Sequence, residues 1–380
     1  MASLYLHIPF CEKKCLYCDF YSIENHSMME EFVQALKKEI ILHQEYKQFE
    51  KIDTIFFGGG TPSLLSPDSI GDIMQHLHST FNINSNAEIT IEANPGTVDL
   101  SKLNAYRSGG INRLSLGVQS FYNDELKFLS RIHSVDDAKQ AVRWAQEAKF
   151  DSINIDLIFA LPGQSLDRWK DNLRQAIDLG TQHISAYSLI VEDNTPLARM
   201  VKAKVVSPLP VESEAEMFEF TMDFLAKNGF EHYEVSNYSK PGFACRHNCN
   251  YWNHTNYLGF GPSAHSFWTD RRWWNIANVQ TYLKQISQGV LPHAGDETLS
   301  PSQLFNEKIM LGLRSGGVDI VEIQSEFGID LLSNEQGLIL NQLLSEDMAI
   351  LEDSTIRLTR QGFLLCDEIS ARLLPNMIAA

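Results

Sequence analysis

Three cysteines lie close together near the start of the chain, in the stretch HIPFCEKKCLYCDF. Cys11, Cys15 and Cys18 fall within eight residues, whereas the next cysteine is Cys245. This spacing places three soft thiolates on one short loop, where they can wrap one face of a cubic [4Fe-4S] cluster. Because such a cube has four irons, three protein ligands leave one iron open, and reactive metal sites keep such a position. From the residues alone, the alternative is a zinc site that a distant histidine completes.

Short β-rich runs are the elements that must position this loop. They are LYLHIP, TIFFGGG, EITIEANP, RLSLGVQS, INIDLIFALP and HISAYSLI. Up to about residue 190 they alternate with longer amphipathic patterns such as EEFVQALKKEIILHQEY and VDDAKQAVRWAQEA. This alternation predicts βαβ units and a parallel sheet.

Glycines and polar residues fall at the carboxyl ends of these runs. After the cysteine loop come Gly58, Gly59 and Gly60 on the second run, Glu92 on the third, Gln119 on the fourth and Asp156 on the fifth. Such strand ends build the active sites of β/α barrels and also of open α/β sheets. We therefore expect an α/β fold, a partial (β/α)6 barrel, with its site at these ends.

Three regions are expected along the chain. Residues 1–240 form the partial barrel, and residues 241–299 form an irregular, aromatic-rich extension that covers the barrel mouth. Residues 300–380 form a small helical domain with a hairpin, similar to a winged helix. This last region carries 5 basic and 12 acidic residues, which argues against DNA binding despite the winged-helix pattern.

Charge and hydropathy restrict the partners and the compartment. The formal charge of -17 disfavours nucleic acid or an anionic membrane surface as the main partner. No segment resembles a signal peptide, and no apolar run is long enough for a transmembrane segment. We expect a cytoplasmic protein, in which six cysteines are thiols or metal ligands rather than disulfides.

The cysteine motif, with Tyr17 before its third cysteine, resembles the signature of radical S-adenosylmethionine enzymes, and GGGTP at 58–62 supports the match. In that family the amino and carboxylate groups of S-adenosylmethionine chelate the open iron. An electron from the cluster can then cleave the sulfonium to a 5'-deoxyadenosyl radical. Glu92 suits the ribose hydroxyls, because an ionised carboxylate accepts hydrogen bonds from both.

RLSLGVQS, SRIH and INIDLIFALPGQ narrow the resemblance to the coproporphyrinogen III oxidase-like branch of that family. This resemblance covers nearly the whole chain. It implies that S-adenosylmethionine is contacted by Tyr5, Tyr17, Gly59, Gly60, Thr61, Glu92, Gln119, Arg131 and Asp156.

Two departures separate the chain from the oxidase itself. Phe20 stands where the oxidase carries a fourth cysteine, and Cys11 lies much nearer the chain start than the oxidase cluster does. Both point to the sister group, heme chaperones of the HemW type, which bear an HNxxYW motif. Here that motif is residues 247–252, so the resemblance implies that heme is bound by His247, Asn248, Tyr251 and Trp252.

The motif also has a physical interpretation. A neutral imidazole can ligate heme iron, and aromatic rings can pack on the porphyrin plane. His232, His254 and His265 are alternative ligands, and each histidine is equally compatible with an ordinary hydrogen-bonded role. Cys245 and Cys249 flank His247 but lack further spaced partners, so they indicate a second metal site only weakly.

The leading hypothesis is a heme chaperone that binds a [4Fe-4S] cluster, S-adenosylmethionine and heme. Its partners would be an electron donor and an acceptor apo-hemoprotein, which a membrane could hold. The resemblance leaves open whether S-adenosylmethionine is cleaved, and no catalytic residue is assigned. The rivals are radical decarboxylation of coproporphyrinogen III to protoporphyrinogen IX and a zinc-stabilised binding module.

Overall fold

The computed structural model describes residues 1–48 and 50–374, and within them most strands form one mixed sheet. Its order is β12-β11-β10-β9-β1-β2-β3-β4-β5-β6-β8-β7, and β1 to β6 pair in parallel with their sequence neighbours. These strands are β1 (Ala2–Ile8), β2 (Ile52–Gly59), β3 (Ile83–Ala93), β4 (Arg113–Gln119), β5 (Ser152–Phe159) and β6 (His183–Ser188). The expected parallel α/β architecture is confirmed.

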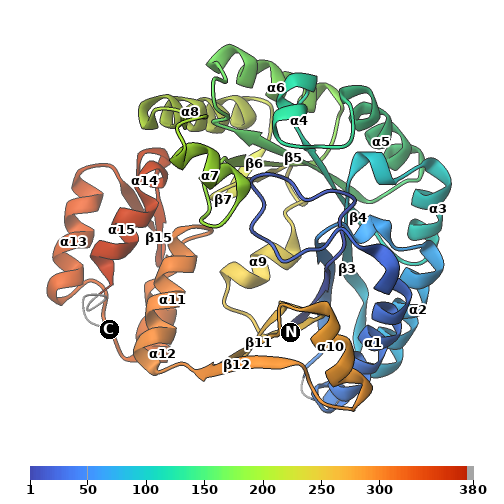
Figure 1. Cartoon of the computed structure of the whole chain (residues 1–380). Coiled ribbons are helices and arrows are strands. Elements are labelled where there is room, and N and C mark those ends of the chain that lie inside the picture. Colours follow the sequence, from blue (N-terminus) through green and yellow to red (C-terminus); the bar gives the residue numbers. More distant parts are fainter. Residues whose placement is uncertain (49, 375–380) are drawn as a thin grey trace.

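Helices between these strands form an outer layer around the sheet (Figure 1). In α5, Ala138, Ala141, Val142 and Ala145 are buried at the three-to-four-residue spacing of an amphipathic helix, and Ser134 with Asp137 forms a capping box at its start. The layer consists of α1 (Met29–Leu42), α2 (Pro67–Thr80), α3 (Leu100–Ser108), α4 (Asn123–Phe128), α5 (Val135–Glu147) and α6 (Leu166–Asp178). Short 3-10 turns lie at His26–Met28, Gln44–Gln48, Pro62–Leu64 and Pro95–Thr97.

The chain after β6 extends both edges of the sheet. After α7 (Pro196–Lys202) and α8 (Val211–Lys227), β7 (Glu231–Glu234) and β8 (Asn237–Ser239) add antiparallel strands beside β6. After α9 (Arg246–Trp252), β9 (Tyr257–Phe260) pairs in parallel with β1. The other edge is completed by β10 (His265–Trp268), β11 (Arg271–Asn275), α10 (Val279–Ser287) and β12 (His293–Thr298).

A buried carboxylate attaches α1 to this extension. Glu39 is fully buried and accepts hydrogen bonds from the backbone N–H of Gly261 (2.8 Å), from Asn275 Nδ2 (2.6 Å) and from the Tyr282 hydroxyl (2.7 Å). Because a buried carboxylate is costly unless it is hydrogen-bonded, these contacts fix the extension against the first helix.

The C-terminal residues have a separate hydrophobic core that includes Phe305, Ile309, Ile323 and Ile356. The helices and the hairpin expected for this region are present, and Cys366 is buried among them. The elements are α11 (Pro301–Leu313), β13 (Val318–Asp319), α12 (Ile320–Phe327), α13 (Asn334–Ser345), β14 (Ala349–Glu352), β15 (Thr355–Leu358), α14 (Arg360–Leu364) and α15 (Cys366–Leu373). The three-region division itself stays a prediction.

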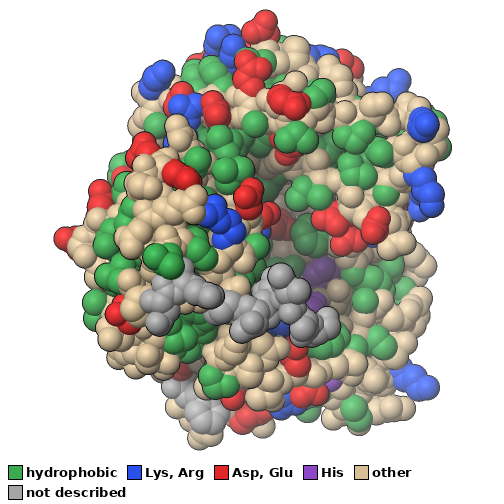
Figure 2. Space-filling view, turned by 90° about the vertical axis from the view of Figure 1, so that its left-hand side faces the viewer, with side chains coloured by type: hydrophobic (Ala, Val, Ile, Leu, Met, Phe, Trp, Pro, Cys, Tyr) green, Lys and Arg blue, Asp and Glu red, His purple; other side chains and the backbone are tan. Residues whose placement is uncertain are grey.

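Contacts with the barrel hold this C-terminal unit in place. The Arg360 guanidinium lies 3.1 Å from a Glu219 carboxylate oxygen and 3.3 Å from one of Asp223, both on α8. Figure 2 shows the face that carries the unit: it is hollowed near its centre, and histidine side chains are visible inside the hollow. None of the helices in the described part of the chain combines the length and apolar character that crossing a bilayer requires.

Candidate functional site

A cavity of about 550 Å³ opens at the carboxyl ends of the parallel strands. The structure brings most of the predicted site residues to its wall. They are Cys11, Cys15, Tyr17, Cys18, Gly59, Gly60, Thr61, Glu92, Gln119, Arg131, Asp156 and Asn248. Tyr5, His247, Tyr251 and Trp252 are not part of the cavity lining.

The cysteine loop follows β1, and Cys11, Cys15 and Cys18 are all free thiols. The Thr61 hydroxyl donates to Cys11 Sγ (3.6 Å), and Arg131 Nη1 donates to Cys15 Sγ (3.3 Å). Burial raises the pKa of the Cys18 thiol to about 11 and also raises that of Cys11. Donors aimed at the sulfurs suit thiolate ligands, which metal coordination deprotonates despite the burial.

The three thiols share a cavity without converging on one point. Among the described residues, no group of three or more His, Cys, Asp or Glu side chains is placed to hold a single metal ion. In a four-iron cluster each thiolate would bind a different iron, so three thiols on one loop are a suitable ligand set.

Gly59 and Gly60 bring the backbone of the second strand end against the cysteine loop. The Gly60 N–H donates to the Ile8 carbonyl (2.8 Å), and the Thr61 N–H donates to the Phe10 carbonyl (2.7 Å). A Cβ on Gly60 would lie 2.6 Å from the Phe10 carbonyl oxygen, and Gly59 has a left-handed φ of 104°. Only glycine allows the two backbone segments to approach so closely.

Glu92 faces the cavity from β3 and is half-buried. Burial raises the pKa of its carboxyl group to about 8, nearby Asp156 adds to the increase, and a backbone hydrogen bond from Gly59 acts against it. Thr90 Oγ1, two residues earlier, is buried and has no hydrogen-bond partner in the described residues. An acceptor and an unpartnered hydroxyl on one face suit a polar ligand such as a ribose.

Arg131 connects the cysteine loop with β4. Its Nη2 donates to the Gly117 carbonyl (2.7 Å), while its Nε is buried without a partner in the described part of the chain. Burial alone would lower the pKa of Arg131, but Tyr17 and Cys15 more than offset this and raise it. Gln119, at the end of β4, has a left-handed φ of 69° beside a shift in strand register. Backbone strain at a strand end facing a cavity is typical of functional sites.

A polar network in the barrel interior was not anticipated from the sequence. Asp156 accepts hydrogen bonds from Asn154 Nδ2 (2.7 Å) and from the Ser115 hydroxyl (3.2 Å). His183 Nδ1 donates to Asn154 Oδ1 (2.6 Å), and Arg113 Nη1 donates to the Ser152 hydroxyl (2.7 Å). The sequence signal for this network is a polar or small residue at every second position of a strand, since every second residue faces the same side of the sheet. Inward positions are Arg113, Ser115, Gly117 and Gln119 on β4, and Asn154 and Asp156 on β5.

The expected position of the HNxxYW motif over the mouth is wrong. Its helix α9 packs against the amino-terminal parts of the strands, where Glu88 of β3 accepts the N–H groups of Arg246 (3.2 Å) and His247 (3.1 Å). The motif therefore closes the floor of the barrel. Cys245 and Asn248 reach the cavity from below, and the Cys245 thiol lies 3.5 Å from Glu88 Oε1.

Both ring nitrogens of His247 have partners. Thr54 Oγ1 donates to Ser3 and therefore accepts from His247 Nδ1 (2.7 Å), which leaves Nε2 to accept from the Tyr251 hydroxyl (3.1 Å). The ring stacks on Phe56, and burial lowers its pKa to about 3. Ligation of heme iron would require Nε2 to lose its hydrogen bond and its enclosure, so a heme role for this motif stays a prediction.

The alternative histidines differ in their surroundings. His232 stacks on Tyr238 and lies at a tilt to Phe363, and burial lowers its pKa to about 4. His254 Nε2 lies 3.1 Å from Glu307 Oε2. His265 is exposed and stacks on Trp274. None of these three lines the cavity.

Known proteins resemble this chain over nearly its whole length. Residues 5–176 match the family model described as the Radical SAM superfamily. The heme chaperone HemW of Bacillus subtilis is 34% identical over 384 residues, covering 99% of this chain and 100% of that protein. HemW of Escherichia coli is 40% identical over 267 residues, 69% of each chain. The structure of coproporphyrinogen III oxidase (HemN) from Escherichia coli matches with a TM-score of 0.86 at 24% identity, covering 99% of this chain and 90% of that one.

The tight approach at Gly60 generates a stability prediction. Gly60→Ala should lower the free energy of unfolding by about 1–3 kcal/mol, because the added methyl group collides with two carbonyl oxygens. Gly71→Ala on α2 is the control, since a Cβ there meets nothing within 4 Å. It should raise stability by about 0.5–1 kcal/mol. Urea unfolding measures both, and a Gly60→Ala protein as stable as the wild type would contradict the close approach.

Proposed function

We propose that this chain, which belongs to the family of HemW heme chaperones within the radical SAM superfamily, binds heme and delivers it to an acceptor hemoprotein. The observation that carries the proposal is one cavity that joins the three-cysteine loop to Glu92 and Arg131, in a chain related to HemW from end to end. The enzymatic rival rests on a likeness to the oxidase at 24% identity, which establishes only the fold.

Cys11, Cys15 and Cys18 would hold three irons of a [4Fe-4S] cluster, with Arg131 and Thr61 donating to two of the sulfurs. The cluster, once bound, supplies an open iron and an electron from an external donor protein. Arg131 would balance part of the negative charge of the thiolates.

S-adenosylmethionine would lie between the cysteine loop and the ends of β2 to β5. Gly59, Gly60 and Thr61 offer backbone groups to its amino end, and Glu92 accepts from its ribose hydroxyls. Tyr17, Gln119 and Asp156 line the remaining wall, whereas Tyr5 supports the site from behind through contact with Gly58. Carboxylates of Glu92 and Asp156 also favour a cationic sulfonium ligand.

Loss of any cluster ligand should abolish the cluster. Wild-type protein reconstituted without oxygen should contain about four irons and four sulfides per chain, and Cys15→Ser should contain almost none. Cys249→Ser is the control, because that thiol lies on α9 and outside the cavity lining. The measurement is the content of iron, zinc and sulfide per chain, and zinc without iron would refute the cluster assignment.

Binding of S-adenosylmethionine should depend on the protonation of Glu92. Its pKa of about 8 means that the neutral form predominates in the free protein at neutral pH. A ligand that donates to the ionised carboxylate binds more tightly as the pH rises from about 6 to about 8, by at most about tenfold per unit. Glu92→Gln should weaken S-adenosylmethionine binding and remove its pH dependence, as measured by equilibrium dialysis. If the affinity of the variant still rises with pH, another group causes the pH dependence.

The chaperone function predicts that the protein binds heme and does not oxidise coproporphyrinogen III. Cluster-loaded protein should bind heme with a Soret band that saturates at a fixed ratio. With S-adenosylmethionine, a reductant and coproporphyrinogen III, it should form no protoporphyrinogen IX, while the Escherichia coli oxidase serves as the positive control. Sustained formation of protoporphyrinogen IX would contradict the chaperone function.

A further inference from the structure

Four large apolar side chains are exposed around the mouth of the cavity. Phe20 is 67% exposed, Ile190 65%, Ile132 44% and Tyr187 39%, and all four line the cavity. They come from three separate segments: the cysteine loop, the turn after α4 and the end of β6. Apolar groups gathered at the rim of a polar cavity indicate a ligand that is partly apolar.

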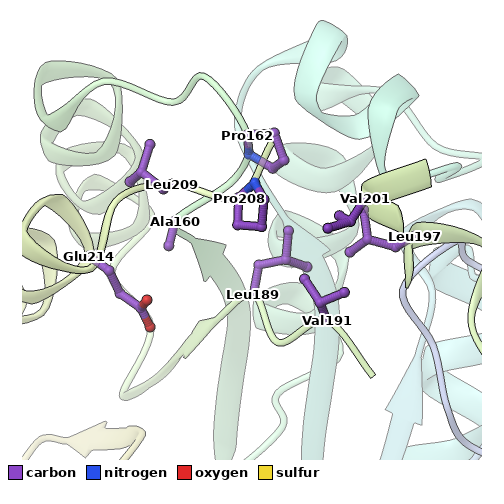
Figure 3. A pocket seen from close by; sticks show the side chains of 9 residues that line it. All are labelled: Ala160, Pro162, Leu189, Val191, Leu197, Val201, Pro208, Leu209 and Glu214. Atoms are coloured by element: carbon purple, nitrogen blue, oxygen red, sulfur yellow. The ribbon is translucent and has the colours of Figure 1, made fainter. Parts of the chain in front are cut away.

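The rim is held in place by the structure beneath it. The Lys14 ammonium donates to the Phe20 carbonyl (2.9 Å), which fixes the backbone of the cysteine loop at that residue. Ile190 stands between Leu189 and Val191, and these two line a small apolar pocket of about 30 Å³ with Leu197, Val201 and Pro208 (Figure 3). The Leu197 N–H in turn donates to the Leu16 carbonyl (3.0 Å), which joins this segment to the cysteine loop.

Charged side chains at the same opening favour one orientation of an amphipathic ligand. Lys13 is exposed on the wall, and no ion pair in the described residues engages it. Glu12, Asp19 and Glu192 also lie there, so a carboxylate-bearing ligand would turn its anionic edge toward Lys13. Aromatic rings at Phe20 and Tyr187 supply faces on which a flat conjugated ligand can stack.

We propose that heme binds at this apolar rim, formed by Phe20, Ile132, Tyr187 and Ile190, and not on the HNxxYW helix at the barrel floor. The inference rests on the proposed chaperone function. Its basis is accessibility: the rim is open and lies directly above the candidate cofactor site, whereas His247 is 1% exposed with both ring nitrogens engaged. In this arrangement α9 is a structural closure that shapes the cavity from below.

Heme titration of rim variants tests the proposal. Phe20→Glu and Ile190→Glu should each weaken heme binding by at least about tenfold, because each places a charge where bound heme would cover an exposed apolar side chain. Leu338→Glu is the matched control: that side chain is 73% exposed on α13, and this variant should bind heme as the wild type does. Ile190→Glu leaves the cysteine loop untouched, and iron content with S-adenosylmethionine binding verifies that each variant is folded.

The possible outcomes distinguish this inference from the function on which it rests. If the wild type binds no heme, the proposed function fails and the rim site with it. If the wild type binds heme and the rim variants bind it equally well, the rim site alone is refuted. Loss of binding in His247→Ala with normal binding in the rim variants would place heme at α9. A change confined to oligomeric state, with unaltered heme affinity, would make the rim a contact between copies and also refute the proposal.

Discussion

Parallel pairing of β1 to β6 in sequence order is the constraint on which the site depends. Parallel strands place all their carboxyl ends at one edge, and each successive side chain faces the opposite side of the sheet. The outward set packs against the helices as a nearly continuous apolar layer. The inward set is then free to be polar. Arg113, Asn154 and Asp156 stay hydrogen-bonded in the barrel interior because their neighbours on adjacent strands are polar too.

Electrostatic balance within this enclosed space follows from the same arrangement. Glu92 and Asp156 are acidic groups whose pKa values burial raises, and Arg131 is a half-buried base beside a cysteine sulfur. Such groups are costly to bury without partners. The cost of burying the carboxylates is offset when a ligand places a cationic centre near them. The cost of burying the guanidinium is offset when the neighbouring cysteines are thiolates. A cluster would keep the cysteines as thiolates, and a sulfonium cofactor would supply the cationic centre. Arg131 Nε and Thr90 Oγ1 have no hydrogen-bond partner among the described residues, so a ligand could bond to them.

Much of this could be predicted from residue order alone. The six parallel strands and the helices between them follow local periodicity and lie close to the runs that predict them, and helices with a hairpin were expected after residue 300. The cavity wall followed from glycines, acids and cysteines at strand ends. The polar network inside the barrel could have been predicted in part, because polar and apolar residues alternate in RLSLGVQ. The location of α9 was not accessible, because Glu88 and Thr54, which hold His247, are more than 150 residues away in the chain.

The pairing of β9 with β1 has a consequence for biosynthesis. Tyr257 lies beside Ser3 in the sheet, so one edge of the first strand has no partner until about two-thirds of the chain has left the ribosome. An unpaired edge of a buried, apolar strand invites association with other chains, and such distant contacts form slowly. The emerging chain therefore exposes one apolar edge of β1 until β9 is made, and the sheet that carries the site is completed only then.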